Sequence, residues 1–307
     1  MTTPVLSVVV LSWNTQALTL ACLRALFAEV PKHPREVLVV DNGSHDGSAD
    51  AIAAAFPQVR LLRNPDNRLY AHGNNQGAAA AQGAFVCTLN SDTEVRAGAL
   101  DRLVDWLLEH GDYGAAAPRL SDPDGSVQRA CMRFPTLATA LCYDSFWGRF
   151  WPGRAVVARY EMRDFDHLHG RDVEQPPGAC CVLPTALWRQ LGGFDEELSL
   201  FYNDVDLCRR LWRAGRRIRY VAEAEVMHHR GASTKNFARM LVLWHKNRRA
   251  YYRKHYGRLG TAWIAVCVQL RIWEEWWRIG RRNRHDPDRK RAERAHLAQA
   301  AREVRSP

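Results

Sequence analysis

Short apolar runs alternate with amphipathic segments through the first 120 residues. The apolar runs have the length and composition of buried strands, at Val5–Leu11, Glu36–Val40, Val59–Leu62, Phe85–Leu89 and Tyr113–Ala117. Apolar residues at helical spacing follow them, in segments 15–28, 49–55, 73–82 and 100–109. This alternation predicts an α/β fold with a largely parallel sheet that helices cover on both faces.

Three of the expected strands run directly into polar residues. These residues are Ser12-Trp13-Asn14, Asp41-Asn42-Gly43-Ser44 and Asn90-Ser91-Asp92. Because the carboxyl ends of parallel strands share one edge of a sheet, we expect the three clusters to face one crevice. Amide, hydroxyl and carboxylate oxygens suit a cation or a phosphate. The chemistry of the protein is therefore expected in this crevice.

The pattern changes after Leu120. Residues 126–175 are rich in aromatic residues, Arg and Pro without a sustained period, which is typical of a substrate-facing loop region. A second block, from about Gly178, predicts strands at 179–183, 217–221 and 226–228 and a helix at 202–214. We expect one domain over residues 1–236, made of halves 1–120 and 121–236, and a helical C-terminal region over 237–307.

The composition of the chain indicates which classes of partner it binds and in which cellular compartment it lies. The 307 residues are 47% hydrophobic, which is enough for a packed core, and the formal net charge of +10 favours anionic partners. The eight cysteines show no Cys-x-x-Cys spacing, so we expect buried free thiols in a reducing cytosol. The first residues lack a basic segment, and their apolar run is too short for a signal peptide or a membrane span. A cytoplasmic location is the expectation.

The C-terminal region combines tryptophan with arginine. A short apolar stretch, 261–268, has Trp263, Trp273, Trp276 and Trp277 around it, and residues 278–294 carry eight Lys or Arg against three acids. Two interpretations stay open. Residues 261–294 form either an interfacial helix that contacts the anionic inner face of the cytoplasmic membrane, or a helical cap whose charges are solvated.

Individual side chains suggest acid–base and metal chemistry, each with a structural alternative. Asp41 suits an N–H of a ligand, such as the imide of a pyrimidine, but Asp-Asn-Gly-Ser is also an ordinary turn. Asp204 and Asp206 begin a helix whose dipole favours one acid, such as Asp204, but explains two acids less well. A carboxylate at a partly buried helix start is also a candidate general base. His228 and His229 end a strand, where a histidine is either structural or a metal ligand beside Asp92, and the residues alone leave open which of the two it is.

Six motifs in one order carry a resemblance. They are Val8–Asn14, Val39–Ser48, Leu89–Asp92, Gly192–Glu196, Asp204–Cys208 and His228–Ser233. This order resembles family 2 glycosyltransferases over roughly residues 5–256 and is most similar to the rhamnosyltransferase-like bacterial members. Segments 124–128 and 133–136 resemble the same subgroup.

The resemblance implies a GT-A fold, a dTDP- or UDP-linked sugar donor, a divalent cation (Mg²⁺ or Mn²⁺) and inversion at the anomeric carbon. By position, Asp204 is the general base, and Asp92 and His228 bind the metal. Donor-binding roles fall on Ser12, Trp13, Asn14, Asp41, Asn42, Asn74, Asn75, Asn90, Ser91, Asp92, Gly178 and Ala179. Acceptor-side roles fall on Arg133, Phe201 and Asn203.

We therefore expect an inverting glycosyltransferase that moves a sugar, such as rhamnose from dTDP-rhamnose, to a hydroxyl of a cell-surface polysaccharide or lipid-linked glycan. A nucleotidyltransferase would need a Gly-rich basic loop near the N-terminus, and residues 12–15 do not supply one. Nucleic acid is not an expected partner, because the basic residues concentrate after residue 209.

The remaining alternative is an inactive glycosyltransferase-like scaffold. Asn90 and Asn203 stand at positions where the family usually has acids. Asp92, Asp204 and His228 are all present, which favours an active enzyme.

Overall fold

A computed structural model of the chain describes residues 3–143, 145–230 and 237–305. The chain divides into two units. The first consists of Met1–Phe134, Phe165–Ser199 and Asn203–Lys235, and the second of Pro135–Asp164, Leu200–Tyr202 and Asn236–Pro307. The expected boundary at residue 236 falls in 231–236, outside the described residues.

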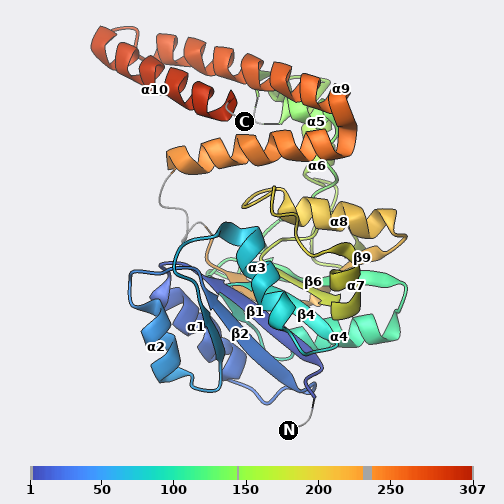
Figure 1. Ribbon diagram of the computed structural model, residues 1–307. Helices are drawn as coiled ribbons and strands as arrows, with labels where there is room; N and C mark the ends of the chain where they lie inside the picture. The colour runs from blue at the N-terminus through green and yellow to red at the C-terminus, as the bar shows by residue number, and fades with distance from the viewer. Residues whose placement is uncertain (1–2, 144, 231–236, 306–307) are drawn as a thin grey trace. The chain divides into compact units, whose positions relative to one another are not determined.

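The first unit is built on one sheet. Its described strands are β1 (Leu6–Ser12), β2 (Arg35–Asp41), β3 (Arg60–Arg63), β4 (Phe85–Asn90), β5 (Thr93–Val95), β6 (Tyr113–Ser121), β7 (Arg171–Asp172), β8 (Cys180–Pro184) and β9 (Arg217–His228). They lie in the order β3-β2-β1-β4-β8-β6-β9-β5, with β7 paired to β9. Figure 1 labels β1, β2, β4, β6 and β9 of this sheet. Strands β3, β2, β1 and β4 are parallel, and so are β6 and β9, which confirms the mostly parallel sheet.

Register brings the three polar strand ends to one edge, as predicted. Ser12 lies opposite Asp41, and Leu11 lies opposite Asn90. Strand β8 runs antiparallel to β4, so its first residues reach the edge where β4 ends. The sheet edge where the sequence predicts a crevice is therefore formed by the ends of β1, β2 and β4 and the start of β8.

Helices cover the sheet of the first unit. They are α1 (Gln16–Phe27), α2 (Ser48–Ala55), α3 (Leu69–Ala80), α4 (Ala99–Glu109), α7 (Thr185–Leu191) and α8 (Asn203–Arg213). The core joins Leu23 of α1 and Leu103 of α4 to Val8 and Val10 of β1. Helix α3 packs on β1 and β2. Since the side chains of a strand alternate between its faces, every second residue of β1 enters this core.

Residues 126–175 differ from the expected irregular loop. They contain α5 (Leu137–Cys142), the 3₁₀ helix η1 (Phe146–Arg149) and α6 (Gly153–Tyr160). These helices have eight residues or fewer, too short for a helical period to stand out in the sequence. The two strands expected at 217–221 and 226–228 form the single strand β9, which has an irregularity in its pairing with β6.

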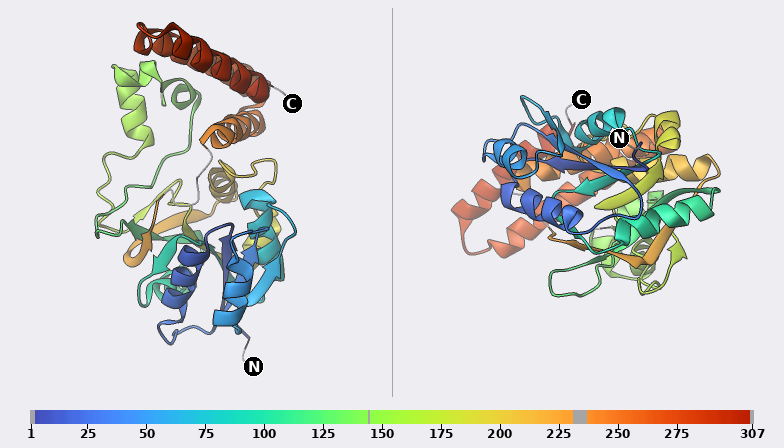
Figure 2. Two further views of the ribbon diagram at one scale, coloured as in Figure 1. Left: turned by 90° about the vertical axis from the view of Figure 1, so that its left-hand side faces the viewer. Right: turned by 90° about the horizontal axis from the view of Figure 1, so that it is seen from below.

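The second unit contains the helices α9 (Phe237–Arg282) and α10 (Pro287–Arg305). Helix α9 is broken at Gly257, whose φ of 62° and ψ of −149° favour glycine. Figures 1 and 2 show α10 beside the last part of α9. Across the ranges that the structure describes, no helix combines the length and apolar character needed to cross a membrane.

The cysteines are free thiols, as the sequence predicts. Seven of the eight are buried.

Candidate active site

Hydrogen bonds join the loop after β1 to the loop after β2. The Asn14 backbone N–H donates to Ser44 Oγ at 2.9 Å, and the His45 backbone N–H donates to Asn14 Oδ1 at 2.8 Å. Asn14 has a φ of 52°, a conformation that asparagine tolerates better than most residues. Trp13, next to it, is half-buried. The two predicted donor-binding loops are thus held against each other.

Asp41 has an unused acceptor in this crevice. Its side chain is 3% exposed, and Oδ2 accepts from the Ser44 backbone N–H at 3.1 Å. Its Oδ1 atom is buried and has no hydrogen-bond partner among the described residues. A buried acceptor without a donor is costly, so the site fits a ligand that brings an N–H, such as the imide of a pyrimidine.

Ser12 and Asn42 contact protein groups. The Ser12 hydroxyl is buried 2.9 Å from Thr19 Oγ1. Asn42 donates from Nδ2 to Asn67 Oδ1 at 3.0 Å, and its Oδ1 accepts from the Arg68 backbone N–H at 3.2 Å. Asn42 thereby holds the loop that leads into α3. Direct donor contacts from these two side chains stay a prediction.

Asn74 and Asn75 lie on α3 and differ in their bonding. Asn74 donates to the Tyr70 carbonyl at 3.0 Å, and its Oδ1 is buried without a described partner. The Asn75 side chain holds Phe194, since it donates to the Phe194 carbonyl at 2.8 Å and accepts from the Phe194 N–H at 2.9 Å. Asn74 therefore keeps a free acceptor for a ligand, whereas Asn75 positions the turn before α8.

Tyr70 connects the end of β4 to the segment before β8, and the sequence did not single it out as a site residue. Its hydroxyl lies 3.2 Å from both Asn90 Oδ1 and the Gly178 carbonyl oxygen. The Asn90 backbone N–H donates to the Ala179 carbonyl at 2.9 Å. Burial and the nearby Asp204 raise the pKa of Tyr70, so its hydroxyl stays protonated and can donate. Asn90 thus serves as an acceptor for a tyrosine.

Asp204 lies at the start of α8 against Gly178. A methyl group at Gly178 would stand 2.6 Å from Asp204 Oδ2, so only glycine leaves room for the carboxylate. Asn203 Oδ1 accepts from the Asp204 backbone N–H at 2.7 Å, which fixes the first turn. Burial raises the pKa of Asp204. A carboxylate with a raised pKa is a better proton acceptor than an ordinary aspartate.

Asp206 is fully buried and has a structural partner. Its Oδ2 lies 2.8 Å from Nε of Arg210, one turn along α8. Asp204 and Asp206 therefore differ in their surroundings, because Asp204 lies beside Gly178 and Asp206 pairs with Arg210.

His228, at the end of β9, faces Asp92. Its Nε2 is 3.4 Å from Asp92 Oδ1, whereas His229 points to Glu94 Oε1 at 3.0 Å. Two ligands about 2.1 Å from one ion lie roughly 3.0–3.4 Å apart at octahedral to tetrahedral angles. The pair Asp92 and His228 therefore fits one cation. The rest of this motif, Gly231 to Ser233, lies outside the described residues.

Gln128 orients His228 and is a second residue that the sequence did not assign to the site. Its amide nitrogen donates to Asp122 Oδ1 and to the His228 carbonyl, both at 2.8 Å. The amide oxygen therefore faces His228 Nδ1, 3.1 Å away, and accepts its proton. In the neutral ring this leaves a lone pair on Nε2 toward Asp92, the arrangement typical of a metal-binding histidine.

Asp92 and His228 are two ligands, and a metal ion needs more. Among the residues that the structure describes, no group of three or more His, Cys, Asp or Glu side chains could hold an ion. Magnesium-type ions commonly take one or two protein ligands and complete their shell with substrate phosphates and water. The site fits a cation that binds together with a diphosphate. Ser91, 3.1 Å from Thr15 Oγ1, lies beside it on the same strand end.

The predicted acceptor-side residues are spread over both units. Arg133 Nη1 lies 3.5 Å from Glu174 Oε1, and Asn203 is the first residue of α8. Phe201 belongs to the second unit, where its backbone N–H donates to Asn247 Oδ1 at 2.9 Å. Their roles toward an acceptor stay predictions.

Sequence comparison identifies the family of this chain. Residues 7–156 match the family Glycosyl transferase family 2, and residues 85–282 match Glycosyl transferase family group 2. The chain is 32% identical over 228 residues to the N-acetylglucosaminyl-diphospho-decaprenol L-rhamnosyltransferase of Mycobacterium tuberculosis, which covers 70% of this chain and 74% of the relative. It is 28% identical to the O-antigen biosynthesis protein RfbC of Myxococcus xanthus over 76% of this chain and 18% of that protein.

Solved structures share the fold. The mannosyltransferase PcManGT of Pyrobaculum calidifontis, in complex with GDP-Man and Mn²⁺, superposes with a TM-score of 0.55 at 16% identity and covers 99% of this chain and 88% of that one. S. aureus TarS 1–349, in complex with UDP-GlcNAc, gives 0.54 at 16% identity over 80% and 65%. The chain therefore belongs to glycosyl transferase family 2 and is a glycosyltransferase with the GT-A fold.

Proposed function

We propose that this glycosyltransferase transfers rhamnose from dTDP-rhamnose, with inversion, to a hydroxyl of a lipid-linked glycan. The observation that carries the proposal is the arrangement at the sheet edge. A carboxylate with a raised pKa, Asp204, adjoins Gly178, and Tyr70 links Gly178 to Asn90 at the end of β4. That strand end leads to Asp92, which lies beside His228. The named Mycobacterium tuberculosis relative supports the sugar and the class of acceptor.

Each residue has a role in the proposed reaction. Asp41 binds the imide N–H of the base through its free oxygen, and Asn74 offers an acceptor to the ribose or the sugar. Asp92 and His228 would hold Mg²⁺ or Mn²⁺ beside the donor diphosphate. When bound, this cation neutralises charge on the departing group.

The displacement moves one proton. The acceptor oxygen bonds to the anomeric carbon while the bond from that carbon to the diphosphate breaks. Asp204 takes the hydroxyl proton, and the electron pair of the broken bond leaves with the nucleoside diphosphate. Attack opposite to the leaving group inverts the anomeric configuration. A lipid-linked acceptor also brings the enzyme to a membrane, and the Trp- and Arg-rich residues 261–294 support contact with its inner face.

Asp204→Asn tests the proposal. Loss of a general base should lower the rate of transfer by about 100- to 10,000-fold and leave the Kd for the nucleotide sugar near that of wild type. Asp206→Asn is the matched control, because it removes an acid two residues away that binds Arg210. We expect that variant to lose stability and to keep its activity per folded molecule. Wild-type turnover in Asp204→Asn would refute the assignment.

A further inference from the structure

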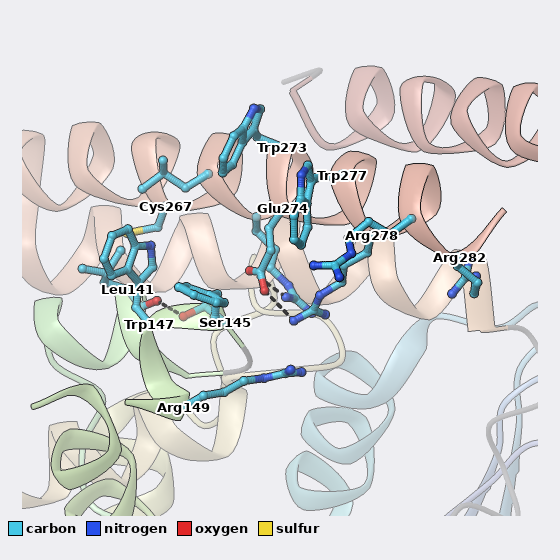
Figure 3. Close-up of a pocket in the computed structure, with 14 residues that line it drawn as sticks. Leu141, Ser145, Trp147, Arg149, Cys267, Trp273, Glu274, Trp277, Arg278 and Arg282 are labelled. Atoms are coloured by element: carbon cyan, nitrogen blue, oxygen red, sulfur yellow. Dashed lines mark hydrogen bonds and ion pairs between the residues drawn. The ribbon is translucent and has the colours of Figure 1, made fainter. Parts of the chain in front are cut away.

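The second unit contains a cavity that the proposed reaction does not use. It has a volume of about 740 Å³, within the range of about 300–1,000 Å³ typical of small-molecule sites. One side comes from α5 and η1, with Leu141 and Trp147, and the other from the last part of α9, with Cys267, Trp273 and Trp277 (Figure 3). The cavity lies wholly within one unit.

Its apolar walls are unusually exposed. Trp147 and Trp273 are 55% and 64% exposed, and Phe146, which also lines the cavity, is about half exposed. Large apolar groups gathered on a surface mark a binding site more often than a solvated face. Because these rings surround a hollow, the shape suits a discrete apolar ligand better than the flat surface of a bilayer.

The cavity is also strongly cationic. Five arginines line it, Arg149, Arg271, Arg278, Arg281 and Arg282, against one acid, Glu274. Glu274 binds Arg271, at 2.9 Å, and Arg278. One carboxylate balances one of these two positive charges. Arg278 also lies 3.6 Å from Glu275, and Arg282 pairs with Glu293 at 2.6 Å, so Arg149 and Arg281 carry the positive charge that remains for a ligand.

Two further arginines are placed for an anion. The Arg281 guanidinium lies over the Trp277 ring, 4.7 Å from its centroid, which leaves its N–H edge for an acceptor. Arg149, on η1, forms no ion pair with any residue in the described ranges. Guanidinium groups bind phosphates in bidentate fashion, so a diphosphate is the complementary head group.

We propose that this cavity binds the isoprenoid diphosphate part of the acceptor lipid, with the chain against the tryptophans and the diphosphate among the arginines. The inference rests on the proposed function only in taking the acceptor as lipid-linked. It assigns to the second unit the recognition of the lipid, separate from the transfer of sugar at the sheet edge of the first unit.

Calorimetric titration of the full-length protein with farnesyl diphosphate tests the site. We expect Trp277→Ala and Arg149→Gln to weaken binding by about tenfold or more. Trp276→Ala and Arg154→Gln are the matched controls, because Trp276 is as exposed as Trp277 (46% and 47%) and neither control residue lines the cavity. The controls should bind as wild type does. Arg149 is exposed on another element, so its variant keeps the test valid if Trp277→Ala unfolds.

Three ligand comparisons complete the experiment. Inorganic pyrophosphate and farnesol should each bind more weakly than farnesyl diphosphate; equal binding of either would reduce the cavity to an anion site or an apolar patch and overturn the proposal. Phosphatidylglycerol vesicles should bind wild type and Trp277→Ala alike. Loss of vesicle binding without loss of farnesyl diphosphate binding would assign the cavity to the membrane surface instead.

The proposed function is tested separately by transfer to a soluble saccharide acceptor that has no lipid. Transfer to the soluble acceptor without binding of farnesyl diphosphate would refute only the proposed lipid site. Binding of farnesyl diphosphate without any transfer would refute only the proposed function.

Discussion

Gln128 is the residue that determines which nitrogen of His228 faces Asp92. Its amide orientation is fixed by two acceptors at 2.8 Å, so its oxygen must accept from Nδ1. Residues that orient a metal-binding histidine typically contribute 10- to 100-fold to metal affinity.

We expect Gln128→Leu to raise the Kd for Mn²⁺ by about 10- to 100-fold, measured by electron paramagnetic resonance in the presence of dTDP. Gln128→Glu keeps an acceptor for Nδ1–H and should recover part of this affinity. An unchanged Kd in Gln128→Leu would remove His228 from the proposed metal site.

The raised pKa of Asp204 predicts how the activity depends on pH. Because burial raises its pKa, the base becomes protonated, and activity is lost, at a higher pH than for an ordinary aspartate with a pKa of about 3.9. The acid limb of the pH profile of kcat/KM should therefore lie above that value.

The same shift has a consequence for stability. A carboxyl group whose pKa is raised by folding destabilises the folded state at pH values above that pKa, where it must carry its charge. Asp204→Asn should consequently have a Tm at pH 7 equal to or above that of wild type. A lower Tm would indicate that the charge stabilises the fold.

The sequence indicated some of these side chains and missed others for a clear reason. Asp92 follows the end of β4 by two residues and His228 ends β9, and strand ends can be located from the apolar pattern. Tyr70 and Gln128 acquire their importance from Asn90, Gly178 and His228, which are 20 to 108 residues away and with which they hydrogen-bond. No local pattern carries that information.

At the scale of elements, the strands β1, β2 and β4 were predictable because buried parallel strands are continuous apolar runs. The direction of β8 was not, since an apolar run has the same appearance in either direction. Strand β5 has only three residues, and α5 and α6 are short, so no period marks them.

His245, in helix α9, predicts how the stability of the protein depends on pH. This side chain is buried, and its Nδ1 has no hydrogen-bond partner among the described residues. Burial, with Arg248 and Arg271 nearby, lowers the pKa of His245 to about 4. The unfolded chain takes up the proton near pH 6.5 and the folded chain only near pH 4. Stability is therefore full above about pH 6.5 and falls as the pH drops toward 4.

Because of this one histidine, we expect the free energy of unfolding to be about 2 kcal/mol lower at pH 5 than at pH 8. Urea unfolding of wild type and His245→Gln at pH 8 and pH 5 measures this difference. The fall in the free energy of unfolding should be smaller by that amount in the variant. His296→Gln, at an exposed histidine of α10, is the control and should retain the pH dependence of wild type.

For the whole molecule, ligand binding should couple to stability. A donor at 100 times its Kd stabilises a folded protein by about 2.7 kcal/mol. We expect dTDP-rhamnose with Mn²⁺ to raise the Tm more than UDP- or GDP-sugars do, and chelation by EDTA to remove most of the shift. In Asp92→Ala the EDTA-sensitive part should vanish. A shift that is equal with and without the metal would argue against a cation on the diphosphate.

The antiparallel strand β8 also sets an order of assembly. Cys87 of β4 pairs with Val182 of β8, 95 residues later, and Asn90 bonds Ala179. During synthesis, the Asp41 side of the crevice can form as soon as β1, β2 and β4 are complete. The side with Gly178, Asp204 and His228 must wait until more than a hundred further residues have left the ribosome, and long-range pairing of this kind is slow. The nascent chain therefore acquires the proposed nucleotide side first and the proposed catalytic side last.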